Sequence, residues 1–120
     1  MNDERSGALL FGQARTDLPP DGLADALRRA GLDARCRESA HREGGAYVRV
    51  DGPGSADCSL ERGDPGEYLV HDAGGERGPL EDLARALSAA LAALGIRHRL
   101  ELYGEGEPPE PVLLLGDPPA

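Results

Sequence analysis

The sequence predicts an α+β fold of two layers, a sandwich in which two helices cover one face of a mostly antiparallel sheet. The first observation is a repeated phrase. LADALRRAGLDARCRE at residues 23–38 and LSAALAALGIRHRLEL at residues 87–102 each read as a helix, a glycine and a strand. The second is the stretch between them, where apolar and polar residues alternate between glycine-rich turns. Helices that flank such a meander form a layer of their own.

The first strand and the first helix follow from local patterns. The apolar run GALLFG at residues 7–12 predicts a buried central strand, and the polar residues after it predict a loop. A helix is expected to begin near Pro20, because proline is tolerated in a first turn. Its apolar stripe consists of Leu23, Ala26, Leu27 and Ala30. Gly31 ends the helix by adopting a left-handed conformation.

Four strands are expected in the middle of the chain, at residues 33–39, 46–51, 56–62 and 67–72. The segments REGG, DGPGS and RGDPG between them contain the glycines and prolines that tight reversals need. We therefore expect consecutive antiparallel hairpins.

The second helix is expected from Pro79 to the residue before Gly95. It carries an apolar stripe of Leu80, Leu83, Leu87, Leu91 and Leu94. Residues 97–103 predict a strand, residues 104–111 an acidic Pro/Gly linker, and residues 112–115 a last buried strand or a docked tail. With a flexible N-terminus at residues 1–6, the 120 residues make one domain.

The predicted order, β-α-β-β-β-β-α-β with a possible final strand, resembles an elaborated ferredoxin-like sandwich. That resemblance implies no function, because many unrelated activities share this architecture.

Composition bounds the partners and the compartment. The formal charge is -9 and every basic residue is arginine, so binding to nucleic acid or to an anionic membrane is disfavoured. No stretch approaches the ~20 apolar residues that cross a bilayer, and no export signal is recognisable, so we expect a cytoplasmic protein. Cys36 and Cys58 are expected to be reduced and buried against the helices.

No catalytic, metal-binding or cofactor signature stands out, so we expect no enzyme, no metal and no cofactor. The histidines and cysteines lack the close pairs typical of zinc sites, and His98 reads as a core residue. No serine has the Gly-x-Ser-x-Gly setting of a nucleophile. Cys36, next to Arg35 and Arg37, would have a lowered pKa if it were exposed.

The strand pattern places polar and aromatic residues on the sheet face away from the helices. The candidates for partner binding are Arg35, Arg37, Tyr47, Arg49, Arg99, Glu101 and Tyr103, together with Glu105 and Glu107 of the acidic tail. The leading hypothesis is a small protein-binding domain, monomeric or homodimeric, such as an inhibitor or immunity-type antagonist of a basic protein. The alternatives are a dimeric small-molecule sensor, a single-stranded nucleic-acid binder, and a solvated face of Arg–Glu pairs.

Overall fold

The computed structural model describes residues 7–38, 46–52, 56–72, 75–104 and 111–116. Its elements in chain order are β1 (Gly7–Arg15), α1 (Pro20–Arg29), β2 (Asp33–Glu38), β3 (Ala46–Asp51), β4 (Asp57–Arg62), β5 (Glu67–His71), β6 (Gly75–Glu76), α2 (Arg77–Ala93), β7 (Arg97–Tyr103) and β8 (Pro111–Gly116). The expected N-terminal tail and most of the expected linker lie outside the described residues. Pro111, assigned to that linker, belongs to β8 instead.

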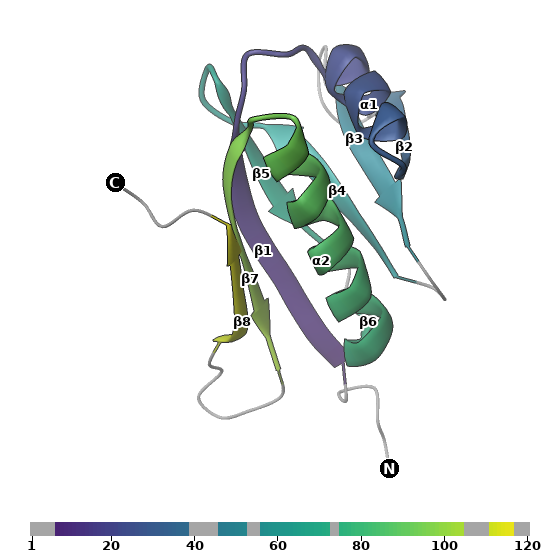
Figure 1. Cartoon of the computed structure of the whole chain (residues 1–120), viewed down its shortest axis with the longest axis vertical. Coiled ribbons are helices and arrows are strands. Elements are labelled where there is room, and N and C mark those ends of the chain that lie inside the picture. Colours follow the sequence, from purple (N-terminus) through teal and green to yellow (C-terminus); the bar gives the residue numbers. More distant parts are fainter. Residues whose placement is uncertain (1–6, 39–45, 53–55, 73–74, 105–110, 117–120) are drawn as a thin grey trace.

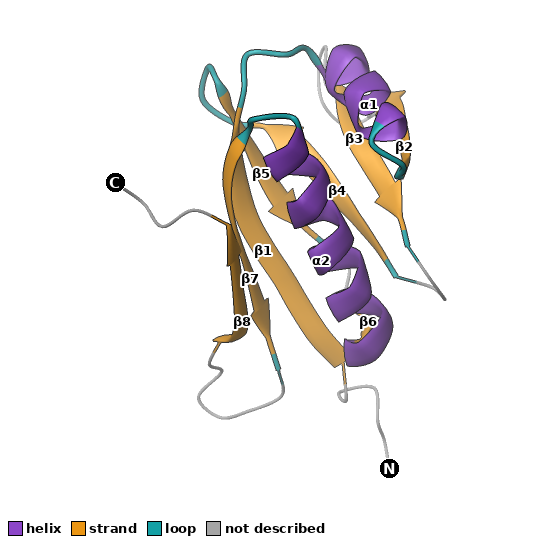
Figure 2. Ribbon diagram, in the orientation of Figure 1, coloured by secondary structure: helices purple, strands orange, loops and turns teal. Residues whose placement is uncertain are grey.

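The strands form one sheet with the order β2-β3-β4-β5-β1-β7-β8, while the short β6 pairs with the start of β1. Every neighbouring pair is antiparallel. Both helices lie on the same face of this sheet, α1 near β2 and β3 and α2 along β1 and β7 (Figures 1 and 2). The predicted α+β fold and its two layers are therefore confirmed.

The order of the strands differs from that of a plain ferredoxin-like sheet, so this finer expectation is not confirmed. The helix α1 leads from β1 to β2, which is an edge strand with β5, β4 and β3 between it and β1. The meander from β2 to β5 then returns to β1 one strand at a time. The sheet is wider on that side of β1, where the four strands of the meander lie, than on the side of β7 and β8.

The two helices end in the same way, as the repeated phrase predicts. Gly31 has a φ of +101° and Gly95 a φ of +74°, both in the left-handed region. The residue after each glycine donates its amide to a leucine carbonyl in the last turn, Leu32 to Leu27 at 3.0 Å and Ile96 to Leu91 at 2.9 Å. This is the Schellman pattern, and it turns the chain directly into the following strand.

The core lies between the helices and one face of the sheet. Its largest fully buried side chains are Tyr68, Leu10, Leu23, Leu27, Leu60, Leu80, Leu83, Leu87, Leu91, Leu100, Leu102 and Val48. In the central strand β1, Leu10 and Ala14 are buried, but Leu9 and Phe11 are each 46% exposed. The expectation that this run is buried as a whole is wrong, because successive side chains alternate between faces and the described helices cover only one.

Two local expectations also need correction. The helix α2 begins at Arg77 rather than at Pro79. Cys36 is exposed, although Cys58 is buried as expected. Cys36 shares the helix-covered face with Ala34, but it lies on the edge strand β2, where less of the chain covers it.

The thiol of Cys36 also titrates against expectation. Its pKa is raised, first by desolvation and then by the carboxylates of Asp21 and Glu38. The arginines on either side of it project from the opposite face of the strand and do not offset these effects. Burial raises the pKa of Cys58 to about 12.

The two thiols should therefore react very differently with a thiol reagent such as a dithiobis-benzoate. At pH 8 we expect the native protein to react at Cys36. This reaction should be slower than that of a free cysteine, because the raised pKa of the Cys36 thiol leaves less of it as thiolate. Cys58 should react only after denaturation. A Cys36→Ser variant that still reacts in the native state would contradict this burial pattern.

The left-handed glycines give a second test. A Cβ at Gly95 would meet nothing within 4 Å, so the cost of Gly95→Ala is conformational, and we expect a loss of about 1 kcal/mol or more. Gly78 is the matched control, because it is exposed in α2, has no positive φ and also has an open Cβ position. Gly78→Ala should hold or raise the free energy of unfolding. Thermal and urea unfolding measure both, and equal effects would contradict the assigned helix end.

Candidate functional site

The strand registers place all the described candidate residues on the face of the sheet opposite to the helices, called here the open face. On β2 and β3, Arg35 pairs with Arg49, and Arg37 pairs with Tyr47. Their strand neighbours Ala34, Val48 and Val50 are buried on the other face. On β7, Arg99, Glu101 and Tyr103 alternate with buried residues in the same way. Glu105 and Glu107 lie outside the described residues.

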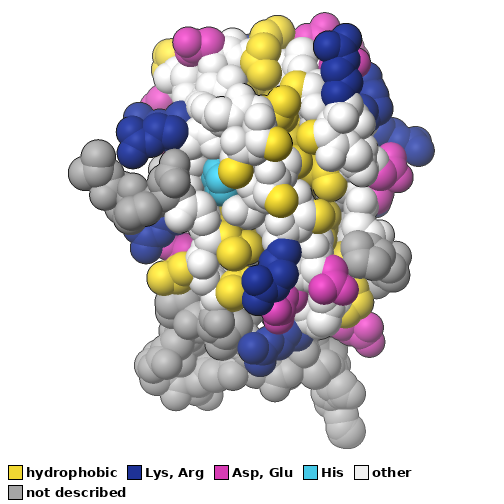
Figure 3. Space-filling view, viewed as in Figure 1, with side chains coloured by type: hydrophobic (Ala, Val, Ile, Leu, Met, Phe, Trp, Pro, Cys, Tyr) yellow, Lys and Arg dark blue, Asp and Glu magenta, His cyan; other side chains and the backbone are white. Residues whose placement is uncertain are grey.

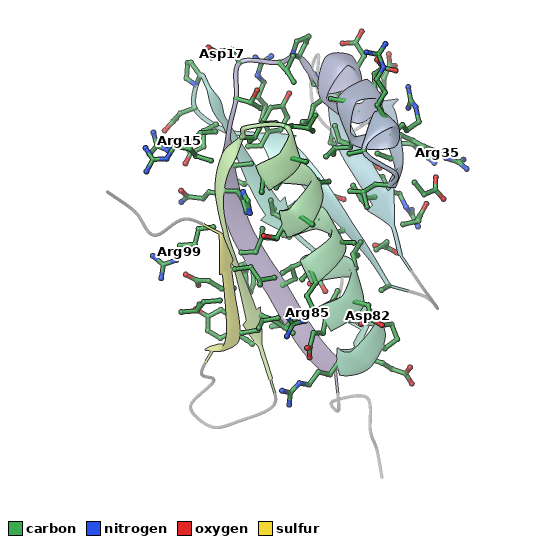
Figure 4. All side chains as sticks on the ribbon, in the orientation of Figure 1. Arg15, Asp17, Arg35, Asp82, Arg85 and Arg99 are labelled. Atoms are coloured by element: carbon green, nitrogen blue, oxygen red, sulfur yellow. The ribbon has the colours of Figure 1, made fainter. Side chains whose placement is uncertain are left out.

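These residues share a face but do not form one cluster. Three strands, β4, β5 and β1, lie between β3 and β7. Figure 4 shows Arg35 at the β2 edge of the sheet and Arg99 on the opposite side, pointing away from each other. A single ligand of small size cannot contact both groups.

The group on the β2 side consists largely of ion pairs, and we call it the outer charged cluster. Its members are Asp33, Arg35, Arg49, Asp51 and Asp57. The guanidinium of Arg49 lies 3.0 Å from Asp51 and 3.2 Å from Asp57, and the hydrogen bond that it donates to Asp51 raises the pKa of Arg49. Arg35 lies 3.6 Å from Asp33. Both arginines are therefore already paired with carboxylates. This is the arrangement expected for a solvated face of arginine–acid pairs.

The group on β7 is also internally bonded. Arg99 lies 2.9 Å from one oxygen of Glu101, and the hydroxyl of Tyr103 donates to the other at 2.7 Å. This hydrogen bond raises the pKa of Tyr103. The tyrosine ring packs edge-on against Phe11, with 6.1 Å between the centroids. The polar end of Tyr103 is therefore satisfied, and its ring extends an apolar surface.

That surface is the feature that the sequence analysis missed, and we call it the apolar stripe. It consists of Leu9, Phe11, Leu69, Tyr103 and Leu114, which lie on β1, β5, β7 and β8. Its members other than Tyr103 are between 45% and 57% exposed. Among the described residues, the other exposed large apolar side chains are Leu18 and Leu94. The register pairs Leu9 with Tyr103 beside Phe11, whereas Glu101 lies between Phe11 and Leu114, and Leu69 pairs with Gln13, one step along the face from Phe11.

Charged residues flank the apolar stripe on both sides of β1. On β4 and β5 these are Glu61 and Glu67, with His71 3.0 Å from Glu61. On β7 they are the pair described above and Arg97. On the helix-covered face the described residues show apolar atoms through the middle of the view and acidic and basic side chains mostly around its edges (Figure 3).

The structure also brings together a serine and a histidine. Ser88 on α2 lies 2.7 Å from Nε2 of His98, whose Nδ1 lies 2.9 Å from the carbonyl oxygen of Ile96. This resembles the hydrogen bonding of a nucleophile and its base. The backbone amides of a helix interior are bonded to carbonyls four residues back, so α2 offers Ser88 no oxyanion donors. The pair serves to satisfy a histidine that is 7% exposed, which agrees with the core assignment of His98.

Among the described residues no group of three or more His, Cys, Asp and Glu side chains is placed to hold a metal ion. No described helix is long and apolar enough to cross a membrane. Comparison with protein-family models, curated proteins and solved structures finds no match. The open face must therefore be interpreted from its own chemistry.

Proposed function

We propose that this protein is a binding domain that recognises a protein partner through the apolar stripe of its open face. The observation that carries the proposal is the exposure of Phe11 and its apolar neighbours in the middle of a sheet face, rather than at scattered positions. Contiguous apolar surface rimmed by polar residues is characteristic of interaction sites. Aromatic residues at the centre and arginines at the rim fit the composition of protein interfaces.

The charges of the open face support a protein partner over a nucleic acid. A single-stranded nucleic acid needs arginines that are free to contact phosphates, whereas Arg35, Arg49 and Arg99 each have a carboxylate within 4 Å. The open-face arginines without such a carboxylate among the described residues, Arg15, Arg37 and Arg97, lie on three different strands. The net charge of -9 adds a general repulsion. The hypothesis of an antagonist of a basic protein rests on that net charge, since the open face itself carries both signs.

The topology supports a finer description of the fold as an elaborated ferredoxin-like sandwich. The helix α2 connects β5 to β7, and β1 lies between these two strands, as in a split βαβ unit. The hairpin of β2 and β3 is then the elaboration. We also propose a reducing compartment such as the cytoplasm, since both cysteines are free.

Replacing Phe11 and Leu69 by threonine should abolish partner binding with little effect on stability. Threonine keeps the strand propensity, and both side chains are about half exposed, so each change should cost about 1 kcal/mol or less beyond the lost ring contact. The measurement is co-purification of a tagged chain from native lysate. The amounts of other proteins and of an untagged copy of the same chain that are retained are both quantified.

The matched control is Leu94→Gln, because Leu94 is 37% exposed and lies at the end of α2, away from the open face. Partners should be retained by the wild type and by the control, and lost with the double variant. Equal retention by all three proteins would reject the open face as the binding surface.

A further inference from the structure

We infer that the partner of the open face is a second copy of this chain, packed sheet to sheet about a two-fold axis that runs along β1. This inference rests on the proposed function, because it names the occupant of the same surface. It predicts a symmetric dimer in which Phe11 of each copy lies near the axis. The charges on the two sides of β1 support this inference.

The two sides of β1 carry opposite charge. The register places Glu67 opposite Arg15 on the β5 side and Arg97 opposite Arg15 on the β7 side. One step along, Glu61 pairs with Leu69 on the first side, and Arg99 pairs with Gln13 on the second. Glu67 and Arg97 form no ion pair with any other described residue. On the β4–β5 side Glu61 is paired with His71, and on the β7 side Arg99 is paired with Glu101, so the charges of these two sides that have no ion pair among the described residues are the carboxylate of Glu67 and the guanidinium of Arg97.

A two-fold axis along β1 exchanges these sides, so that the acidic side of each copy faces the basic side of the other. Glu67 then lies opposite Arg97 of the second copy, and His71 lies opposite its Glu101. An axis across the strands would instead place β5 on β5 and β7 on β7 with their directions reversed, so that Glu67 could not face Arg97 of the second copy. In face-to-face sheet packing the two-fold axis lies between the sheets, and electrostatic complementarity selects between these directions.

The available surface is sufficient for a weak dimer. With β1 on the axis, the strands β4, β5, β1, β7 and β8 overlap with their counterparts. At ~4.8 Å between strands and over about 20 Å of their length, they cover about 500 Å² on each copy. A standard protein interface buries about 800 Å² per partner, so we expect a dissociation constant in the micromolar range. Of the outer charged cluster, only Asp57 on β4 lies within this overlap.

One contact on the axis is unfavourable. Arg15 would lie near Arg15 of the second copy, at the end of the strands where solvent screens the charges. Each of these arginines has Glu67 beside it on β5 and Arg97 beside it on β7. The apolar contacts around Phe11 lie closer to the centre.

The test is charge reversal of Glu67 and Arg97, read by sedimentation velocity over a wide range of protein concentration. The wild type should dimerise with rising concentration, and Phe11→Thr should remain a monomer. Glu67→Arg and Arg97→Glu should each weaken the dimer at least tenfold, because like charges then face each other twice per dimer. A mixture of these two variants should dimerise like the wild type, since both contacts are complementary in the mixed dimer. A purely structural role of either residue does not produce this rescue.

The outcomes separate the two proposals. A wild type that stays monomeric, but loses a different partner when Phe11 is replaced, would overturn the dimer and leave the binding function standing. A dimer that Phe11→Thr disrupts but charge reversal does not affect would overturn the axis along β1. A dimer that Phe11→Thr leaves intact uses another surface and also overturns the inference. If replacing Phe11 changes neither self-association nor capture of any partner, both proposals fail.

Discussion

The structure depends on the burial of two leucine-lined helices against a single face of a wide antiparallel sheet. Both helices lie on the same side, and each is followed, after a left-handed glycine, by a strand that enters the sheet directly. This geometry fills one face with leucine and leaves the reverse side to solvent. Every strand consequently has a buried face and an exposed face, and what the exposed side chains do is the functional question. The apolar stripe matters because nothing in the core of this domain requires it.

Much of the fold could be predicted from the sequence because its signals are local. The glycine stops at Gly31 and Gly95, the turn segments and the period-two alternation fix the elements within a few residues. The strand order is not local. Whether the meander enters the sheet beside β1 or at its far edge depends on packing across the whole domain, and no residue spacing encodes it. The sequence places the start of α2 at Pro79, two residues too late. A proline is tolerated anywhere in the first turn of a helix, so it does not mark the first residue.

The candidate site could be predicted only in part. Alternation correctly assigned Arg49 and Tyr103 to the open face, because a strand periodicity needs no tertiary information. It could not show that Arg49 is held by Asp51 and Asp57, since Asp57 lies on another strand. Phe11 was missed because a continuous apolar run reads as buried on both faces. The exposed status of Cys36 was missed for a related reason, since burial at an edge strand depends on how far the covering helix reaches.

Charged residues of the open face differ in whether they are paired within the monomer. The outer charged cluster is neutralised by contacts within one copy, so it gains little from any neighbour. Near β1 the opposite holds, because Glu67 and Arg97 flank the same strand and have no ion pair among the described residues. A surface that buries apolar side chains also has to satisfy the charges at its rim. Here Glu67 and Arg97 are each complementary to the charge that a two-fold rotation about β1 brings to them, and Arg15 is the charge that meets its own copy. A partner other than a second copy would need to supply this same pattern, whereas the chain itself already contains it.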